Sequence, residues 1–389
     1  MTLTVRAYNV LFGDAILVSW EEDDGEHHAW IDFGNFHNDP NAVFETVYQD
    51  IKKVTQGKLD LVVVTHRHLD HLEGFYSLRQ RFASDFVVER LWHAHVTSAT
   101  DTLFDFTERA LRARLPLGVL RGEGEIGRVW RNNFGDVGIG TADRMNAIRR
   151  DLGVPAARTF AIHRGLGLKT ANALPPGMRR LAIEVLAPEK DSGVYLAPLE
   201  EALRRRGLLA SDGNRGARGR SLDPFAPVRG VGFATSPLRQ LADFARLRRQ
   251  LRSGDLDLLG AVDRTRNNTS IVMRWTHGQT RLLFTGDAEE TSWTMMRQKQ
   301  VPLAAHAIKV GHHGSINASP PWSFTEVLPT KAATNAAIVS TEPSRFTGEN
   351  EVPKREVLDG WKKRLTKASR LLRTDKRPLG KPVIVRFES

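Results

Sequence analysis

The chain contains no cysteine among its 389 residues. This absence excludes disulfide bonds, and it also excludes thiolates as ligands for a metal ion. Any bound metal ion would therefore have to be held by histidine nitrogens and carboxylate oxygens. Mixed nitrogen and oxygen sites of this kind favour zinc, manganese or iron.

Long apolar runs are lacking as well. No uninterrupted apolar stretch approaches the about 18 residues that a membrane-spanning helix needs. The N-terminus does not show the basic and then apolar pattern of a secretory signal peptide. We therefore expect a soluble, cytoplasmic protein, whose length allows either two domains or one large domain with insertions.

Acidic residues are outnumbered by basic ones, and the formal net charge is +11. Such an excess points to an anionic partner, and nucleic acid is the commonest one for a basic protein. Arginines crowd the middle of the chain, where solvated helix faces would explain them as well as phosphate contacts would. The candidate nucleic-acid contacts there are Arg215, Arg218, Arg220, Arg248 and Arg249.

The most informative motif follows the apolar stretch Leu61 to Val64. It places four side chains that can bind metal within six residues, namely His66, His68, Asp70 and His71. Two imidazoles at positions i and i+2 can converge on one divalent ion, while the next two side chains can reach a second ion. A role of the aspartate as a helix cap would explain none of the three histidines.

Two later loops add residues of the same kind. Thr285-Gly286-Asp287 follows one apolar run, and Gly311-His312-His313-Gly314-Ser315 follows another. Because the ends of strands at one edge of a sheet collect the site residues of an α/β fold, the three loops can meet although they are far apart in the sequence. Taken together they predict a metal centre, although Asp287 alone would be read as a turn residue.

These motifs resemble those of the metallo-β-lactamase fold of metal-dependent hydrolases. The resemblance is closest to the soluble hydrolase domain of ComEC-type DNA-uptake proteins. It rests on the metal motif, on Asn267 to Val272, on Lys309 to Ser315 and on the opening Asn9 to Leu17. It covers roughly residues 3–95, 180–190 and 265–388, and leaves most of the middle unmatched.

The resemblance implies a centre of two ions. His66 and His68 would hold the first ion, Asp70 and His71 the second, and Asp287 would bridge them with its two oxygens. One histidine of the later pair would complete the second site, and we favour His312. The ions, zinc or manganese, would then activate a water for hydrolysis. In the family the carboxylate of Asp70 would steer that water, and the remaining histidine, His313, would contact or protonate the substrate.

The first ion lacks the third imidazole that many relatives supply from another loop. The candidate here is His95, just past a predicted strand, although an isolated histidine in such a place is more often structural. The first ion is therefore expected to be weakly held. Asp32 could support the centre from behind by fixing the ring orientation of a ligating histidine, although a turn role for it is equally compatible with the sequence.

The order of predicted elements indicates an α/β protein with a four-layer αββα metallo-β-lactamase sandwich. Residues 1–96 would form its first half and residues 265–389 its second half. Residues 97–264 would be a large, mostly helical, Arg-rich insertion with one core strand near 181–187.

Function follows from the resemblance and the charge. We expect a metal-dependent phosphodiesterase, a nuclease that cleaves DNA or RNA. The alternative is hydrolysis of a small ester, thioester, lactam or phosphorylated metabolite at the same centre. A binding module with a vestigial site is disfavoured because every ligand type of the first motif is present.

Overall fold

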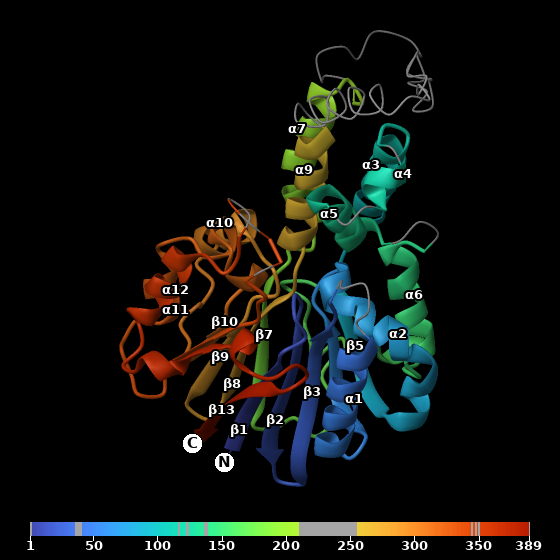
Figure 1. The fold of residues 1–389 in the computed structure, drawn as a ribbon. Coiled ribbons are helices and arrows are strands. Elements are labelled where there is room, and N and C mark those ends of the chain that lie inside the picture. Colours follow the sequence, from blue (N-terminus) through green and yellow to red (C-terminus); the bar gives the residue numbers. More distant parts are fainter. Residues whose placement is uncertain are drawn as a thin grey trace.

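The structure is a computed structural model, and it describes residues 2–35, 41–115, 117–121, 124–135, 139–209, 255–343, 345–346, 348 and 351–388. Within these residues the protein is an α/β protein with two mixed sheets (Figure 1). No helix in the described ranges is long and apolar enough to cross a membrane.

The first sheet has seven strands in the order β13-β1-β2-β3-β4-β5-β6. Strands β13, β1, β2 and β3 pair antiparallel, whereas β3, β4, β5 and β6 pair parallel. The first and last strands of the chain are therefore neighbours, and the two termini lie close together in Figure 1. The bounds are β1 Thr2–Tyr8, β2 Ala15–Glu22, β3 Gly25–Phe33, β4 Lys58–Val64, β5 Val87–Ala94, β6 Thr159–Ile162 and β13 Pro382–Glu388.

The second sheet has six strands in the order β12-β11-β10-β9-β8-β7. Strands β7, β8 and β9 pair antiparallel, and β9, β10, β11 and β12 pair parallel. The bounds are β7 Leu181–Ala187, β8 Val272–His277, β9 Thr280–Phe284, β10 Ala307–Lys309, β11 Ala336–Val339 and β12 Leu371–Arg373.

The two sheets share one hydrophobic core, and helices cover the opposite face of each. Strand β4 shows why the apolar run Leu61 to Val64 is buried throughout. Successive side chains of a strand point to opposite faces. Leu61 and Val63 therefore join the core between the sheets. Val62 and Val64 pack instead against the helices on the outer face.

In the described part of the chain, three helices pack on the outer face of the first sheet and three on that of the second, at opposite sides of Figure 1. The first set is α1 Asn41–Thr55, α2 Leu69–Asp85 and α6 Thr141–Asp151. The second set is α10 Glu290–Gln298, α11 Ser323–Val327 and α12 Arg355–Lys362.

A separate helical cluster with its own small core stands above the sheets in Figure 1. Its members are α3 Ser98–Arg112, α4 Leu117–Leu120, α5 Glu125–Phe134, α7 Ala197–Arg205 and α9 Leu256–Asn268. They all begin within the predicted insertion 97–264. That region also contributes the expected core strand β7, and strand β6, which the sequence did not indicate.

A close approach of two backbones ties the first metal-motif loop to the end of strand β3. A side chain on Gly34 would meet the carbonyl oxygen of Leu69 at 2.3 Å and the backbone nitrogen of His71 at 2.5 Å. The amide nitrogen of Asp14 donates to the carbonyl oxygen of Asp70 at 2.9 Å in the same place. These contacts hold the start of helix α2 against the sheet.

Candidate metal centre

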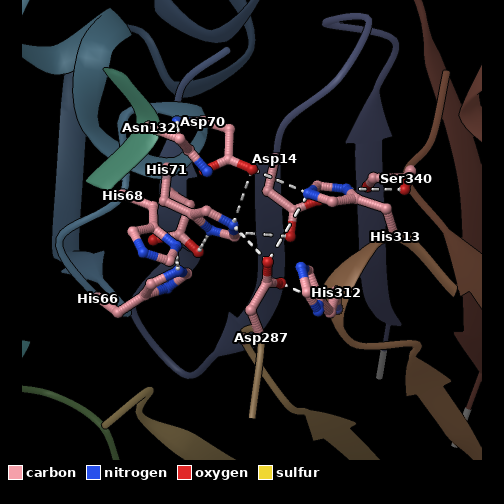
Figure 2. Close-up of polar contacts among 12 residues, drawn as sticks. Asp14, His66, His68, Asp70, His71, Asn132, Asp287, His312, His313 and Ser340 are labelled. Carbon is pink, nitrogen blue, oxygen red and sulfur yellow. Dashed lines mark hydrogen bonds and ion pairs between the residues drawn. The ribbon is translucent and has the colours of Figure 1, made fainter. Parts of the chain in front are cut away.

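The three predicted loops meet at one edge of the two sheets. The first joins β4 to α2, the second joins β9 to α10, and the third follows β10. A backbone hydrogen bond of 3.0 Å from Ile271 to Thr65 links the loops of the two sheets. Figure 2 shows the histidine and aspartate side chains of these loops turned toward one another.

Four buried side chains form the centre of this cluster. They are Asp70, His71, Asp287 and His313, each at most 1% exposed. The Nε2 atom of His313 lies 3.0 Å from Oδ2 of Asp70, and Nε2 of His71 lies 3.2 Å from Oδ2 of Asp287. One ligand atom from each residue lies within 4.8 Å of the others, so the group could hold a metal ion.

Hydrogen bonds to Nδ1 fix the orientation of the two imidazoles of this group. Nδ1 of His71 donates to Oδ2 of Asp32 at 2.8 Å, and Nδ1 of His313 donates to the carbonyl oxygen of Ser340 at 3.1 Å. A proton on Nδ1 leaves the lone pair on Nε2, which is the atom that faces the carboxylates. Figure 2 shows both Nε2 atoms directed into the cluster.

His66 and His68 are buried beside this group and face each other. Nε2 of His66 lies 3.1 Å from Nδ1 of His68. The opposite nitrogen of each ring has an oxygen partner: Oγ1 of Thr65 lies 3.2 Å from His66, and Oδ1 of Asn133 lies 2.9 Å from His68. Two ligands at about 2.1 Å from one ion lie about 3.0–3.4 Å apart, so the facing nitrogens are suitably spaced.

The charges of the cluster suit a cation. Burial lowers the pKa of the His66 imidazole well below its ordinary value, which keeps the ring neutral. Burial also lowers the pKa of His71, but the carboxylates around it, Asp287 foremost, raise it well above its ordinary value. Burial raises the pKa of Asp287, and the neighbouring imidazoles of His71 and His313 bring it well below its ordinary value. The His71 imidazole thus favours a bound proton, and a metal ion would compete with that proton for the ring nitrogen.

Unsatisfied atoms point to the same place. Among the described residues, Oδ1 of Asp70, Nε2 of His71 and Oδ2 of Asp287 are buried without a hydrogen-bond partner. Leaving a buried polar group unpaired costs about 1–3 kcal/mol, and more for a charged group. A divalent ion would satisfy carboxylate and imidazole atoms together, so these residues fit a metal.

Asp32, for which the sequence left a supporting role and a turn role open, accepts a hydrogen bond from Nδ1 of His71. It also accepts from the backbone nitrogen and the hydroxyl of Thr65, both at 2.7 Å. Its backbone φ is 53°, a left-handed value that asparagine tolerates well. We expect Asp32→Asn to weaken metal binding about 10- to 100-fold, because the amide no longer fixes the ring of His71 with a negative charge. Isothermal titration with Zn²⁺ measures this.

Asp60 provides a matched control for that substitution. Its carboxylate accepts from Nδ1 of His27 at 2.8 Å, in an aspartate–imidazole pair outside the cluster. We expect Asp60→Asn to leave metal affinity unchanged. Equal losses in the two variants would show that the effect of Asp32 is a general loss of stability.

The structure separates the two adjacent histidines, and it does so against the preference for His312. His313 belongs to the buried group, whereas Nδ1 of His312 lies 2.9 Å from Oε1 of Glu289. The backbone nitrogen of His312 donates to Asp287 of the group at 2.9 Å. Both residues have a left-handed backbone, with φ of 44° and 53°, and this turns their side chains in different directions.

His95 lies elsewhere. Its ring centroid is 5.1 Å from that of His163, and its backbone nitrogen donates to Ile162 at the end of β6. Neither a hydrogen bond nor a ring contact joins it to His66 or His68 in the described part of the chain. The structure therefore does not bring this candidate to the first pair of imidazoles.

Two features of the site were missed in the sequence. Nζ of the buried Lys309 donates to Oδ2 of Asp14 at 2.7 Å, directly behind His71. Asn133 comes from helix α5 of the insertion and holds His68. The position of Lys309, two residues before Gly-His-His, could have indicated the pair with Asp14. No local sequence pattern indicates the role of Asn133.

A cleft of about 700 Å³ lies next to the cluster, and His312 is part of its lining. Its lining includes Phe12, whose ring lies 4.0 Å from that of His313, and Asn132, which accepts from the backbone of Asp70 at 3.2 Å. Helices α5 and α9 of the region 97–264 contribute much of the wall. The predicted contacts Arg215, Arg218, Arg220, Arg248 and Arg249 lie outside the described residues.

Comparison of the chain with models of known protein families and with curated protein sequences finds no match.

Proposed function

We propose that the protein is a metal-dependent hydrolase of phosphodiesters, a nuclease with the four-layer αββα metallo-β-lactamase sandwich. The layered packing supports the fold, since two sheets share a core and helices cover their outer faces. The observation that carries the function is the group Asp70, His71, Asp287 and His313. Its side chains are buried, and hydrogen bonds to Nδ1 fix the orientation of its two imidazoles. Some of its polar atoms have no hydrogen-bond partner among the described residues.

The centre would take two divalent ions, zinc or manganese. His66 and His68 would hold one, and Asp70, His71, Asp287 and His313 the other. The first pair has only two imidazoles, which supports weaker binding there. Bound ions would supply a water of lowered pKa and would offset the charge that develops on the phosphate.

The remaining residues prepare the site. Asp32, Ser340 and Asn133 fix the rings of His71, His313 and His68 by the hydrogen bonds described above. Phe12 covers the ring of His313 and limits its exposure to solvent. A rigid set of ligands needs little reorganisation during the reaction, which is how such sites gain rate.

Two observations support a nucleic-acid substrate. The net charge of +11 favours association with a polyanion. The cleft wall also includes Arg264, an exposed residue whose guanidinium has no carboxylate partner among the described residues.

A small substrate is the second candidate. The cleft lining also includes Ile126, Val129, Leu259 and Val352. Pockets for small molecules typically measure about 300–1,000 Å³ and are mostly apolar. The volume and these walls would suit an ester, thioester, lactam or phosphorylated metabolite.

The test is a cleavage assay with Mn²⁺ or Zn²⁺ on single-stranded DNA, duplex DNA, RNA and bis(p-nitrophenyl) phosphate. We expect cleavage of at least one nucleic acid by the wild type, suppression by EDTA and recovery on adding metal. Asp70→Ala should be inactive, because it removes a carboxylate of the central group.

Two results would count against the nuclease. Absence of cleavage of every phosphodiester while the metal is bound at full occupancy contradicts it. Cleavage of a small ester or lactam alone would favour the second candidate. A salt titration adds a check, since nucleic-acid binding should weaken steeply between about 50 and 200 mM salt.

A further inference from the structure

A second group of metal-binding side chains lies in the wall of the cleft, outside the central group. It consists of Asp263 on helix α9, Glu289 just before helix α10, and His312. One ligand atom from each lies within 4.8 Å of the others. All three line the cleft, so an ion could enter from solvent.

The two carboxylates are held in place by asparagine amides. Nδ2 of Asn133 donates to Oδ1 of Asp263 at 2.6 Å, and Nδ2 of Asn267 donates to Oε1 of Glu289 at 2.9 Å. Such outer hydrogen bonds orient carboxylate ligands in metal sites. The amides carry no charge, however, so they do not neutralise the acids.

No lysine or arginine among the described residues balances the charge of the two acids. Only 3% of the Glu289 side chain is exposed, yet its ion-pair partner among the described residues is an imidazole, that of His312. Asp263 likewise has no lysine or arginine within 4.0 Å in the described ranges, and its one ionisable partner is His68 at 3.8 Å. Buried Asp14, by contrast, has Lys309. Burying a carboxylate without a cation is costly.

An ion pair between His312 and Glu289 is the simpler reading of their contact. Such a pair would balance the charge of Glu289 but not that of Asp263. The contact also lacks hydrogen-bond geometry, since Nδ1 of His312 is buried without a hydrogen-bond partner in the described part of the protein. Its 2.9 Å from Oε1 of Glu289 is close to the about 3 Å that separates two neighbouring ligands of one ion.

We propose that Asp263, Glu289 and His312 form a further divalent-cation site, distinct from the central group. Two carboxylates and one imidazole form a nitrogen and oxygen donor set that suits Zn²⁺ or Mn²⁺. The ion there takes the charge of the two acids and binds Nδ1 of His312 in place of a proton.

The site also bears on substrate binding, in an argument that depends on the proposed function. Without a cation, Asp263 and Glu289 place negative charge in the cleft that a phosphodiester would have to enter. A divalent ion on these residues turns that wall into one that attracts a phosphate. The cation site itself is inferred from the distances and the charge balance of the three residues, and it does not depend on the proposed function.

The experiment counts ions rather than turnover. The full chain is stripped with a chelator and dialysed against a fixed free concentration of Mn²⁺, and bound manganese is measured by elemental analysis. We expect Glu289→Gln and Asp263→Asn each to bind one ion fewer per chain than the wild type. Asp257→Asn, an exposed acid on the same helix, should bind the full number.

The reciprocal variant separates this site from the central group. Asp70→Ala should lose manganese from the centre while keeping the ion that Glu289→Gln loses. An unchanged count in both folded wall variants overturns the proposal, and so does the loss of every ion from either. If both wall variants fail to fold by circular dichroism, a double variant decides. Asp70→Ala/His312→Gln must bind one ion fewer than Asp70→Ala, and equal counts refute the site. A failure of nuclease activity would leave these counts unaffected.

Discussion

Asp287→Asn is expected to slow metal-dependent hydrolysis about a thousandfold. Asp287 lies close to both imidazoles of the central group, 3.2 Å from His71 and 3.7 Å from His313. Asparagine keeps the shape and can still accept from the backbone of His312, but it removes the negative charge. Metal ions contribute several kcal/mol to such reactions, and about 1.4 kcal/mol corresponds to a factor of ten.

The measurement is the steady-state rate on the best substrate of the assay, together with metal affinity by titration. Asp50→Asn is a suitable control, since Asp50 lies on helix α1, accepts from the hydroxyl of Tyr8 and is not part of the group. Both rate and affinity should fall in the first variant and stay at the wild-type level in the second. A variant at position 287 with wild-type affinity and rate would refute the ligand assignment.

Lys309→Met is expected to lower the free energy of unfolding by about 3–5 kcal/mol. The lysine is 3% exposed and Asp14 is 1% exposed. Removing the ammonium leaves a buried carboxylate without its counter-ion, 4.0 Å from Nδ1 of His71. The attraction between two buried charges is offset by the cost of removing both from water, so the loss of one partner does more harm than the loss of both.

Denaturant unfolding at neutral pH in the presence of EDTA measures this, because chelation removes the contribution of bound metal. The double variant Lys309→Met/Asp14→Asn should recover part of the loss. Lys363→Met, at an exposed position, should change stability by no more than about 0.5 kcal/mol. A loss of similar size in the exposed variant, or a double variant that is less stable than Lys309→Met, would contradict the role of the ion pair.

Part of the region that interrupts the resemblance contributes to the site. Helix α5 supplies Asn132 and Asn133, and helix α9 supplies Asp263 and Arg264. These residues hold the backbone of Asp70, the ring of His68 and one wall of the cleft. Changes in these helices should therefore affect metal binding and substrate choice as well as stability.

Local patterns predicted most elements near the site. The run Leu61 to Val64 is buried on both faces and forms the core of β4, and the apolar residues from Leu72 to Phe82 lie on α2. Helix α2 begins at Leu69, so Asp70 and His71 lie in its first turn. Strands β6 and β12 were not predicted, because strands of 4 and 3 residues are too short to show an alternating pattern of apolar and polar residues.

The convergence of the three loops could also be expected from the sequence, because each follows a strand. The choice between His312 and His313 could not. Ring direction there depends on the left-handed backbone of both residues and on the carbonyl of Ser340, which follows β11. Neither feature can be predicted from the residues of the motif itself.

The sequence alone determined the kinds of ligand, since a chain without cysteine and with His-x-His-x-Asp-His can offer a metal only imidazole and carboxylate. It also determined the strands that carry them. The tertiary structure alone decided which nitrogen faces inward, which acids have a protein cation and which do not. Those properties depend on partners such as Asn133, Lys309 and Ser340, which only chain folding brings within hydrogen-bond distance.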